Sequence, residues 1–182
     1  MGLAGSTLGL LDYVWPRIRG RLDGLTDEEY RWEPVPSCWS VRRTDAGTWD
    51  ADHADTPPEP SPVTTIAWRT WHIGNQCLGG FAQLLFGADP LSLDPYEWYG
   101  TADAARRAMD EAWAGFSDGC HELGDEEMAA ALGPDWGPWA ESNRADALLH
   151  VADELIHHGA EVALLRDLYA AGAPTTGSAE VP

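Results

Sequence analysis

Apolar residues recur at three- and four-residue steps in four segments of the chain, which is the spacing of amphipathic helices. In the first segment, Leu8, Leu11 and Val14 share one face. The predicted helices cover residues 6–25, 61–86, 101–123 and 142–171. Pro16 predicts a kink or a late start in the first helix. Four such helices predict an all-α fold, a four-helix bundle.

Capping residues support two of these boundaries. Ser61 before Pro62 is a good start for the second helix, because proline suits the first helical position. Ser142 or Asn143 caps the last helix, which ends before Gly172.

The connections between the helices are rich in residues that disfavour regular structure. Residues 44–60 hold several aspartates and prolines and predict a long crossover loop between the first and second helices, without a packed element. Residues 125–139 predict a second irregular connection, and no segment alternates as a strand does. We expect residues 1–172 to form a single domain and residues 173–182 to be a disordered tail.

Composition excludes some functions. The net charge is −19, which disfavours nucleic-acid binding. All 11 basic residues are arginines, so the chain has no lysine for Schiff-base chemistry. No apolar run is long enough to span a membrane, and no signal peptide is recognisable, so we expect a cytoplasmic protein. The spacing of the 3 cysteines fits neither a disulfide framework nor a thiolate zinc site and predicts reduced thiols.

Polar side chains on the last predicted helix point toward the core. His158 lies within the apolar stripe of that helix, and Glu154 lies at its edge, one turn earlier. Neither side chain is stable there without a partner. Shared ligation of a metal ion, a buried Glu–His hydrogen bond and exposure at one end of the bundle all remain open.

His72, in the middle of the second predicted helix, is the best third ligand. It shares a polar face with Trp68 and Gln76. That face lines either an internal cavity or the solvent, and the periodicity does not separate the two.

The order of these motifs resembles the DinB/YfiT-like superfamily of four-helix-bundle metalloenzymes. The similar segments are residues 25–34, the Trp-Ser-Val sequence within residues 38–42, residues 65–74 around His72, and residues 149–169. The resemblance implies a metal set of three histidines, which maps onto His72, Glu154 and His158. Glutamate stands where the family has its second histidine, and the resulting set admits Zn, Ni, Mn or Fe.

The resemblance also implies an activity. It predicts a transferase or isomerase that acts on a small-molecule substrate and uses a low-molecular-weight thiol such as mycothiol or bacillithiol, whose pKa the metal lowers. The arginine-only, alanine- and glycine-rich composition is typical of a high-GC bacterium and favours mycothiol. A metal-dependent hydrolase is an alternative, and so is a non-catalytic binding or stress-response module with a vestigial metal site. The family further implies a homodimer.

Several neighbours are candidates for an outer layer around the metal set. His150, His157 and Glu161 lie on the same side of the last helix as Glu154 and are expected to support or replace a ligand. Arg69 binds a substrate carboxylate or pairs with an acid. Trp68 belongs to the core or to the pocket wall. Two further tryptophans precede the last helix and either wall a pocket mouth or pack the loop, namely Trp136 and Trp139.

Overall fold

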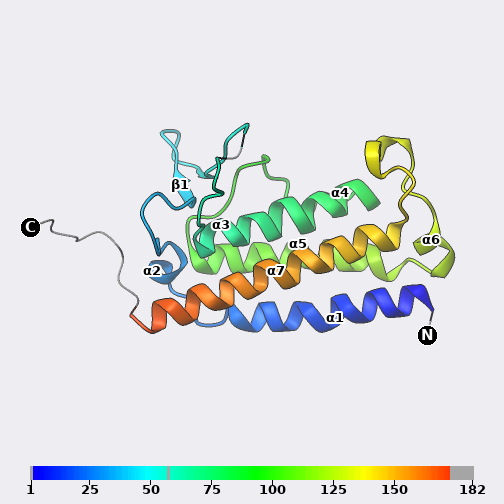
Figure 1. Cartoon of the computed structure of the whole chain (residues 1–182), viewed down its shortest axis with the longest axis horizontal. Helices are drawn as coiled ribbons and strands as arrows, with labels where there is room; N and C mark the ends of the chain where they lie inside the picture. Colours follow the sequence, from blue (N-terminus) through cyan, green and yellow to red (C-terminus); the bar gives the residue numbers. More distant parts are fainter. Residues whose placement is uncertain (1, 57, 173–182) are drawn as a thin grey trace, which may run out of the picture.

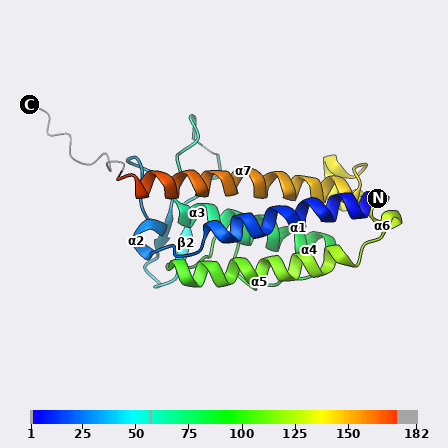
Figure 2. The same ribbon diagram turned by 90° about the horizontal axis from the view of Figure 1, so that it is seen from below.

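The computed structural model describes residues 2–56 and 58–172. Four long helical segments lie side by side, which confirms the all-α bundle (Figures 1 and 2). They are α1 (Leu3–Arg21), a second helix made of α3 (Ile66–Trp71), η1 (His72–Gly79) and α4 (Gly80–Phe86), then α5 (Ala102–His121) and α7 (Arg144–Ala170). None of the helices described is long and apolar enough to cross a membrane.

The first helix differs from its predicted bounds at both ends. It begins at Leu3, so the late start predicted from Pro16 is wrong. It continues through Pro16 and ends at Arg21, after which Thr26 caps the short helix α2 (Asp27–Tyr30).

The two connections predicted to be irregular contain structure. Within residues 44–60 lies the strand β2 (Trp49–Ala51), which pairs antiparallel with β1 (Val41–Arg43). Gly47 has a φ of 91° in the turn between the strands, a conformation that glycine adopts without strain. Within residues 125–139 lie α6 (Asp125–Ala129) and a 3₁₀ helix, η2 (Pro134–Trp139). Strands of three residues are too short to show a period of two, which is why the pattern missed them.

The second helix begins later than Ser61–Pro62 predicts. Backbone hydrogen bonds from Trp39 to Val63 (3.0 Å) and from Thr65 to Trp39 (2.9 Å) hold the preceding residues extended. The helix therefore begins at Ile66, where the Thr65 hydroxyl accepts a hydrogen bond from the Trp68 amide. These pairings anchor the β1–β2 region beside the start of the helix.

The last helix begins where its capping residues predict. The Asn143 side chain accepts a hydrogen bond from the Asp146 amide, and the Asp146 carboxylate accepts one from the Asn143 amide. The apolar stripe of α7 is buried, including Val151, Leu155 and Val162. This stripe packs against α1 and sets the orientation of the polar side chains along its edge.

Candidate metal centre

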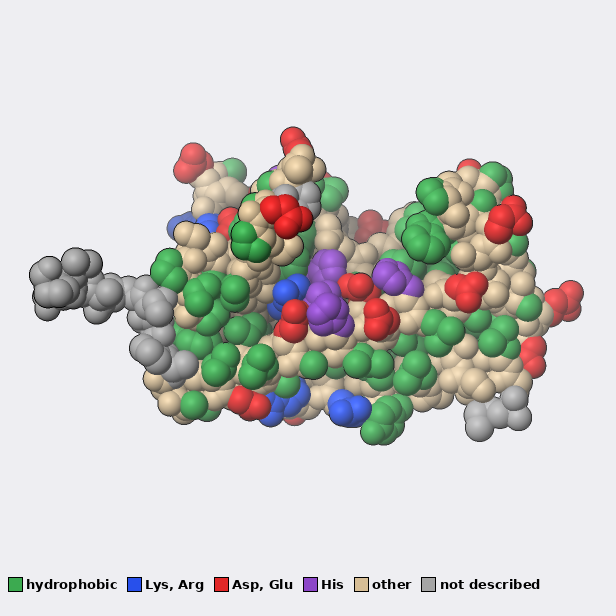
Figure 3. All heavy atoms as spheres, in the orientation of Figure 1, with side chains coloured by type: hydrophobic (Ala, Val, Ile, Leu, Met, Phe, Trp, Pro, Cys, Tyr) green, Lys and Arg blue, Asp and Glu red, His purple; other side chains and the backbone are tan. Residues whose placement is uncertain are grey.

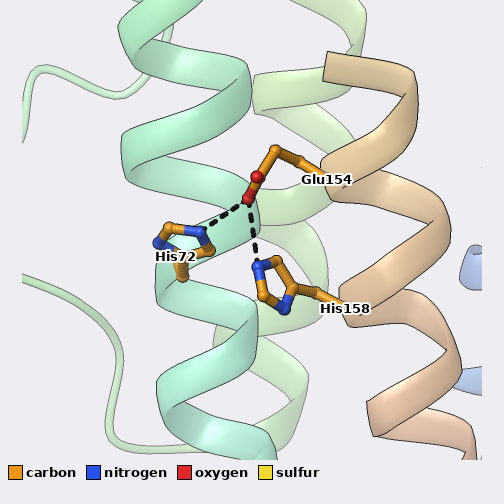
Figure 4. Close-up of side chains that lie close together, drawn as sticks. All are labelled: His72, Glu154 and His158. Carbon is orange, nitrogen blue, oxygen red and sulfur yellow. Dashed lines mark hydrogen bonds and ion pairs between the residues drawn. The ribbon is translucent and has the colours of Figure 1, made fainter. Parts of the chain in front are cut away.

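The three predicted ligands converge between the second helix and α7. His72 is the first residue of η1, whereas Glu154 and His158 lie one turn apart on α7 (Figure 4). The Oε2 atom of Glu154 is 3.0 Å from His72 Nε2 and 3.0 Å from His158 Nε2. One ligand atom from each of the three lies within 4.8 Å of the others.

These distances suit a single ion. A tetrahedral ion with bonds of about 2.1 Å separates its ligand atoms by about 3.4 Å. The two pairs at 3.0 Å therefore need to open by only a few tenths of an ångström. Two imidazole nitrogens and one carboxylate oxygen also form a three-ligand set that leaves positions for water or substrate.

His158 has a carboxylate at each ring nitrogen. Its Nδ1 is 2.6 Å from Glu161 Oε2, and its Nε2 faces Glu154. An ionised carboxylate only accepts hydrogen bonds, so both contacts are satisfied when the ring carries both protons. A metal ion at Nε2 would take the place of one of these protons, and the Nδ1–H donated to Glu161 would then hold the ring in the ligating tautomer.

His72 is oriented in the same way. Its Nδ1 lies 2.9 Å from Gln76 Oε1, so an Nδ1–H donated to that amide oxygen would leave the Nε2 lone pair available to a bound ion. The indole of Trp68 stacks on the His72 ring, with ring centroids 5.4 Å apart and planes 11° from parallel. The helical pattern placed Gln76 on the same face as His72 but did not assign it as a hydrogen-bond partner. The spacing of four residues between them was the signal that could have identified it.

The local backbone at His72 is unusual. Residues His72–Gly79 form a π-helical segment, in which hydrogen bonds connect residues i and i+5, and such segments often occur at functional sites. Gly74 lies within it against the Trp98 ring, where a β-carbon would collide. The wider turn is thus packed against its neighbours at the point where it presents His72.

A chain of charged contacts extends beyond His158. The Arg69 Nε is 2.7 Å from Glu161 Oε2, and its Nη2 donates a hydrogen bond of 3.1 Å to Glu161 Oε1. Burial alone raises the pKa of the Glu161 carboxyl, but the hydrogen bond with His158 and the charge of Arg69 together hold that pKa below its usual value. Arg69 is largely buried, and this lowers the pKa of its guanidinium.

The pKa of the Glu154 carboxyl is also lowered. Burial raises its pKa, whereas the hydrogen bond with His72 and the charges of His158, His72 and His150 lower it, and the result is below the usual value. A carboxyl with a lowered pKa stays ionised, as a metal ligand must be.

Four of the five neighbouring candidates touch this network. Trp68 and Glu161 contact the imidazoles directly, and Arg69 contacts Glu161. His157 is exposed, stacks on His158 at 4.5 Å and reaches Glu161 at 3.5 Å. His157, His158 and Glu161 also lie close enough to form a second metal-binding group that shares His158. His150 stands apart, beside the Phe81 ring at 5.7 Å.

The centre is open to one face of the molecule. Histidine side chains gather there at the floor of a hollow between two raised lobes (Figure 3). A cavity at the base of one lobe is lined by Phe81, Trp136, Trp139 and His150, so the two tryptophans do wall a pocket.

Comparison with protein families identifies the class to which this fold and site belong. The model of the DinB superfamily matches residues 10–162, and the chain therefore belongs to the DinB superfamily. Members of this superfamily generally bind metal. Neither the curated proteins nor the solved structures contain a match.

Proposed function

We propose that the protein is a metal-dependent enzyme whose divalent ion is held by His72, Glu154 and His158. The observation that carries the proposal is the pairing of each imidazole: Nε2 faces the common centre, while Nδ1 contacts Gln76 or Glu161. Outer partners of this kind fix the tautomer of metal-binding histidines. The family membership supports the same reading.

The residues of the chain would hold and orient the reactants at this centre. A bound divalent ion supplies a Lewis acid that lowers the pKa of a coordinated thiol or water. Glu154 contributes negative charge and a hard oxygen ligand, which admits manganese or iron beside zinc and nickel. The Arg69–Glu161 pair keeps the His158 ring in place while the open face admits a substrate.

Within this proposal the favoured reaction is transfer or isomerisation with a low-molecular-weight thiol of the mycothiol or bacillithiol type, which rests on the family resemblance. A hydrolase uses the same ligands with water as the nucleophile. Assays with and without added thiol separate the two, because only the transferase or isomerase loses turnover when the thiol is omitted. We also propose a cytoplasmic location, since the 3 cysteines are free and buried.

A non-catalytic module is the second candidate, and one observation favours it. The contacts from Arg69 through Glu161, His158 and Glu154 to His72 form a continuous network without an ion. A structural hydrogen-bond network would have this form as well.

Metal analysis of protein purified without a histidine tag tests the proposal. We expect about one divalent ion per chain, and loss of binding in His72→Ala and His158→Ala, since each removes a ligand. His121→Ala is the control, because this histidine lies on α5 beside Ser117, outside the cluster. Titration calorimetry with zinc and manganese measures the affinities.

Wild-type protein that takes up no stoichiometric metal, or the two ligand variants binding as well as His121→Ala, would rule the enzyme proposal out. That result would favour the structural module.

We further propose a homodimer formed through the groove between α1 and α7. Ile18 and Gly159 lie at its floor, and Ile156 and Leu164 are 47% and 59% exposed beside it.

A charge at the centre of such an interface is unfavourable, so Leu164→Glu should shift the protein toward the monomer. Light scattering after size exclusion measures the mass. Leu84→Glu on α4 is the control, at a position 62% exposed, and equal masses for both variants contradict this interface.

A further inference from the structure

The aromatic cavity beside the metal centre has the size of a binding site for a small ring. It encloses about 230 Å³, and its walls include Phe81 from α4, Leu132 from the loop, and the two tryptophans of η2. A cavity of about 150 Å³ lined by apolar side chains is large enough to bind benzene. The Trp136 and Phe81 ring centroids are 6.0 Å apart and their planes are inclined by 52°, so two of the aromatic walls contact each other in a tilted arrangement.

The loop that carries the tryptophans is pinned at its base. Antiparallel pairing joins Ala131 to Asn143, and backbone hydrogen bonds connect Leu132 to Ser142 at 2.8 Å and Gly133 to Ala140 at 3.1 Å. Trp139 remains 67% exposed at the rim, although solvent exposure of so large an apolar side chain is unfavourable. The loop thus presents an aromatic side chain that has no partner among the residues described.

The cavity lies one helical turn from the candidate metal centre. His150 lines it and lies on α7 one turn before Glu154, a rise of about 6 Å along the helix. A molecule with its ring in the cavity can therefore extend along α7 toward the centre.

The charge around the cavity selects among ring compounds. Asp146 is the acidic side chain among its lining residues, and no arginine lines it. An aromatic acid would meet the negative charge of Asp146 there, whereas a neutral or cationic compound would not.

We propose that this cavity binds the aromatic ring of a small, uncharged or cationic molecule, and that an uncharged one extends its polar end along α7 to the His72–Glu154–His158 centre. The second part rests on the proposed function. The first part concerns a site that exists without metal.

Fluorine NMR with three matched probes tests the binding site on chelator-treated protein. The probes are para-fluorobenzylamine, para-fluorobenzyl alcohol and para-fluorobenzoate. We expect saturable binding of the amine and the alcohol in the millimolar range or tighter, and binding of the benzoate at least about tenfold weaker. Asp146→Asn should reduce the difference in affinity between the amine and the benzoate. The asparagine keeps a side-chain oxygen that accepts the hydrogen bond from the Asn143 amide.

Variants at the wall show where the ring binds. Trp139→Ala and Trp136→Ala should each weaken amine binding by about tenfold, because they remove stacking area. Tyr13→Ala is the matched control, since it removes an aromatic side chain that is 63% exposed on α1. Circular dichroism verifies that each variant is folded. Absent or non-saturable binding of the amine, equal binding of the benzoate, or equal effects of the Tyr13 and Trp139 variants would overturn the proposal.

The link to the centre has a separate readout. In protein loaded with Mn²⁺, the fluorine relaxation rate of the bound alcohol should rise, because relaxation by a paramagnetic ion acts over short distances. Trp139→Ala should remove most of this effect. Unchanged relaxation in Mn²⁺-loaded protein that still binds the alcohol would overturn the second part alone. Failure to bind Mn²⁺ contradicts the metal proposal and leaves the result for chelated protein standing.

Discussion

At the scale of single residues, Glu154 would decide which ion the proposed centre prefers. One of its oxygens faces both imidazoles at 3.0 Å, so the carboxylate is the shared member of the set. It also stands where the resembled family has histidine. A carboxylate oxygen is a harder ligand than an imidazole nitrogen, so its presence shifts the preference toward manganese or iron.

Glu154→His therefore should restore a three-imidazole set. We expect zinc and nickel to bind more tightly relative to manganese in this variant than in the wild type, as competition titrations would measure. Asp153→His is the control, because it adds an imidazole at an exposed position on the adjacent residue. An unchanged ratio of zinc to manganese affinity would argue against Glu154 as a ligand.

The sequence predicts the inner residues of the site better than the outer ones. Glu154 and His158 are four residues apart on one helix, so helical geometry alone brings them together. The pairing of Arg69 with Glu161 joins residues 92 positions apart and depends on how two helices dock, which no local pattern specifies. His150 is also four residues from Glu154, but its side chain lines the aromatic cavity together with the tryptophans of η2.

At the scale of elements, Gly159 determines how closely α7 approaches α1 beside the candidate ligand His158. A β-carbon on Gly159 would lie 2.6 Å from the Cγ1 atom of Ile18, so a larger residue pushes the two helices apart.

Gly159→Ala should destabilise the protein by about 1–3 kcal/mol through overpacking, measured by urea unfolding. Gly9→Ala on α1 is the matched control, because no atom lies within 4 Å of a β-carbon built there. That substitution should stabilise the helix by about 0.5–1 kcal/mol. If both substitutions changed the free energy of unfolding in the same direction, close packing at Gly159 would not be the cause of the change.

Helix ends set by local chemistry were predictable, and helix features set by packing were not. The Asn143 cap acts on its own helix and is confirmed. The second helix begins at Ile66 because Trp39, distant in sequence, binds the backbone before it. The π-helical turns after His72 likewise accompany contacts between Gly74 and Trp98, which become visible only in the folded chain.

At the scale of the whole molecule, the centre bridges two of the four long helical segments. An ion held by His72, Glu154 and His158 would tie the second helix to α7, in addition to the Arg69–Glu161 pair that already joins them. Binding only to the folded state stabilises it by about 2.7 kcal/mol at a hundredfold excess over Kd.

We therefore expect the metal to raise the melting temperature of the wild-type protein by about 5–10 °C in a thermal scan, and a chelator to reverse the rise. His158→Ala should show no rise, while His121→Ala should respond as the wild type does. An equal rise in the His158 variant would mean that the ion binds elsewhere, for example among the 30 acidic residues of the chain.

The separation of the ligands along the chain also has a consequence for biosynthesis. His72 and Glu154 are 82 residues apart, and two of the three ligands lie on α7, the last helix described. A ribosome has therefore made the first three helical segments before any complete ligand set exists. In the proposed centre an ion could enter only after α7 has emerged and docked, so metal uptake would mark the end of folding rather than guide its beginning.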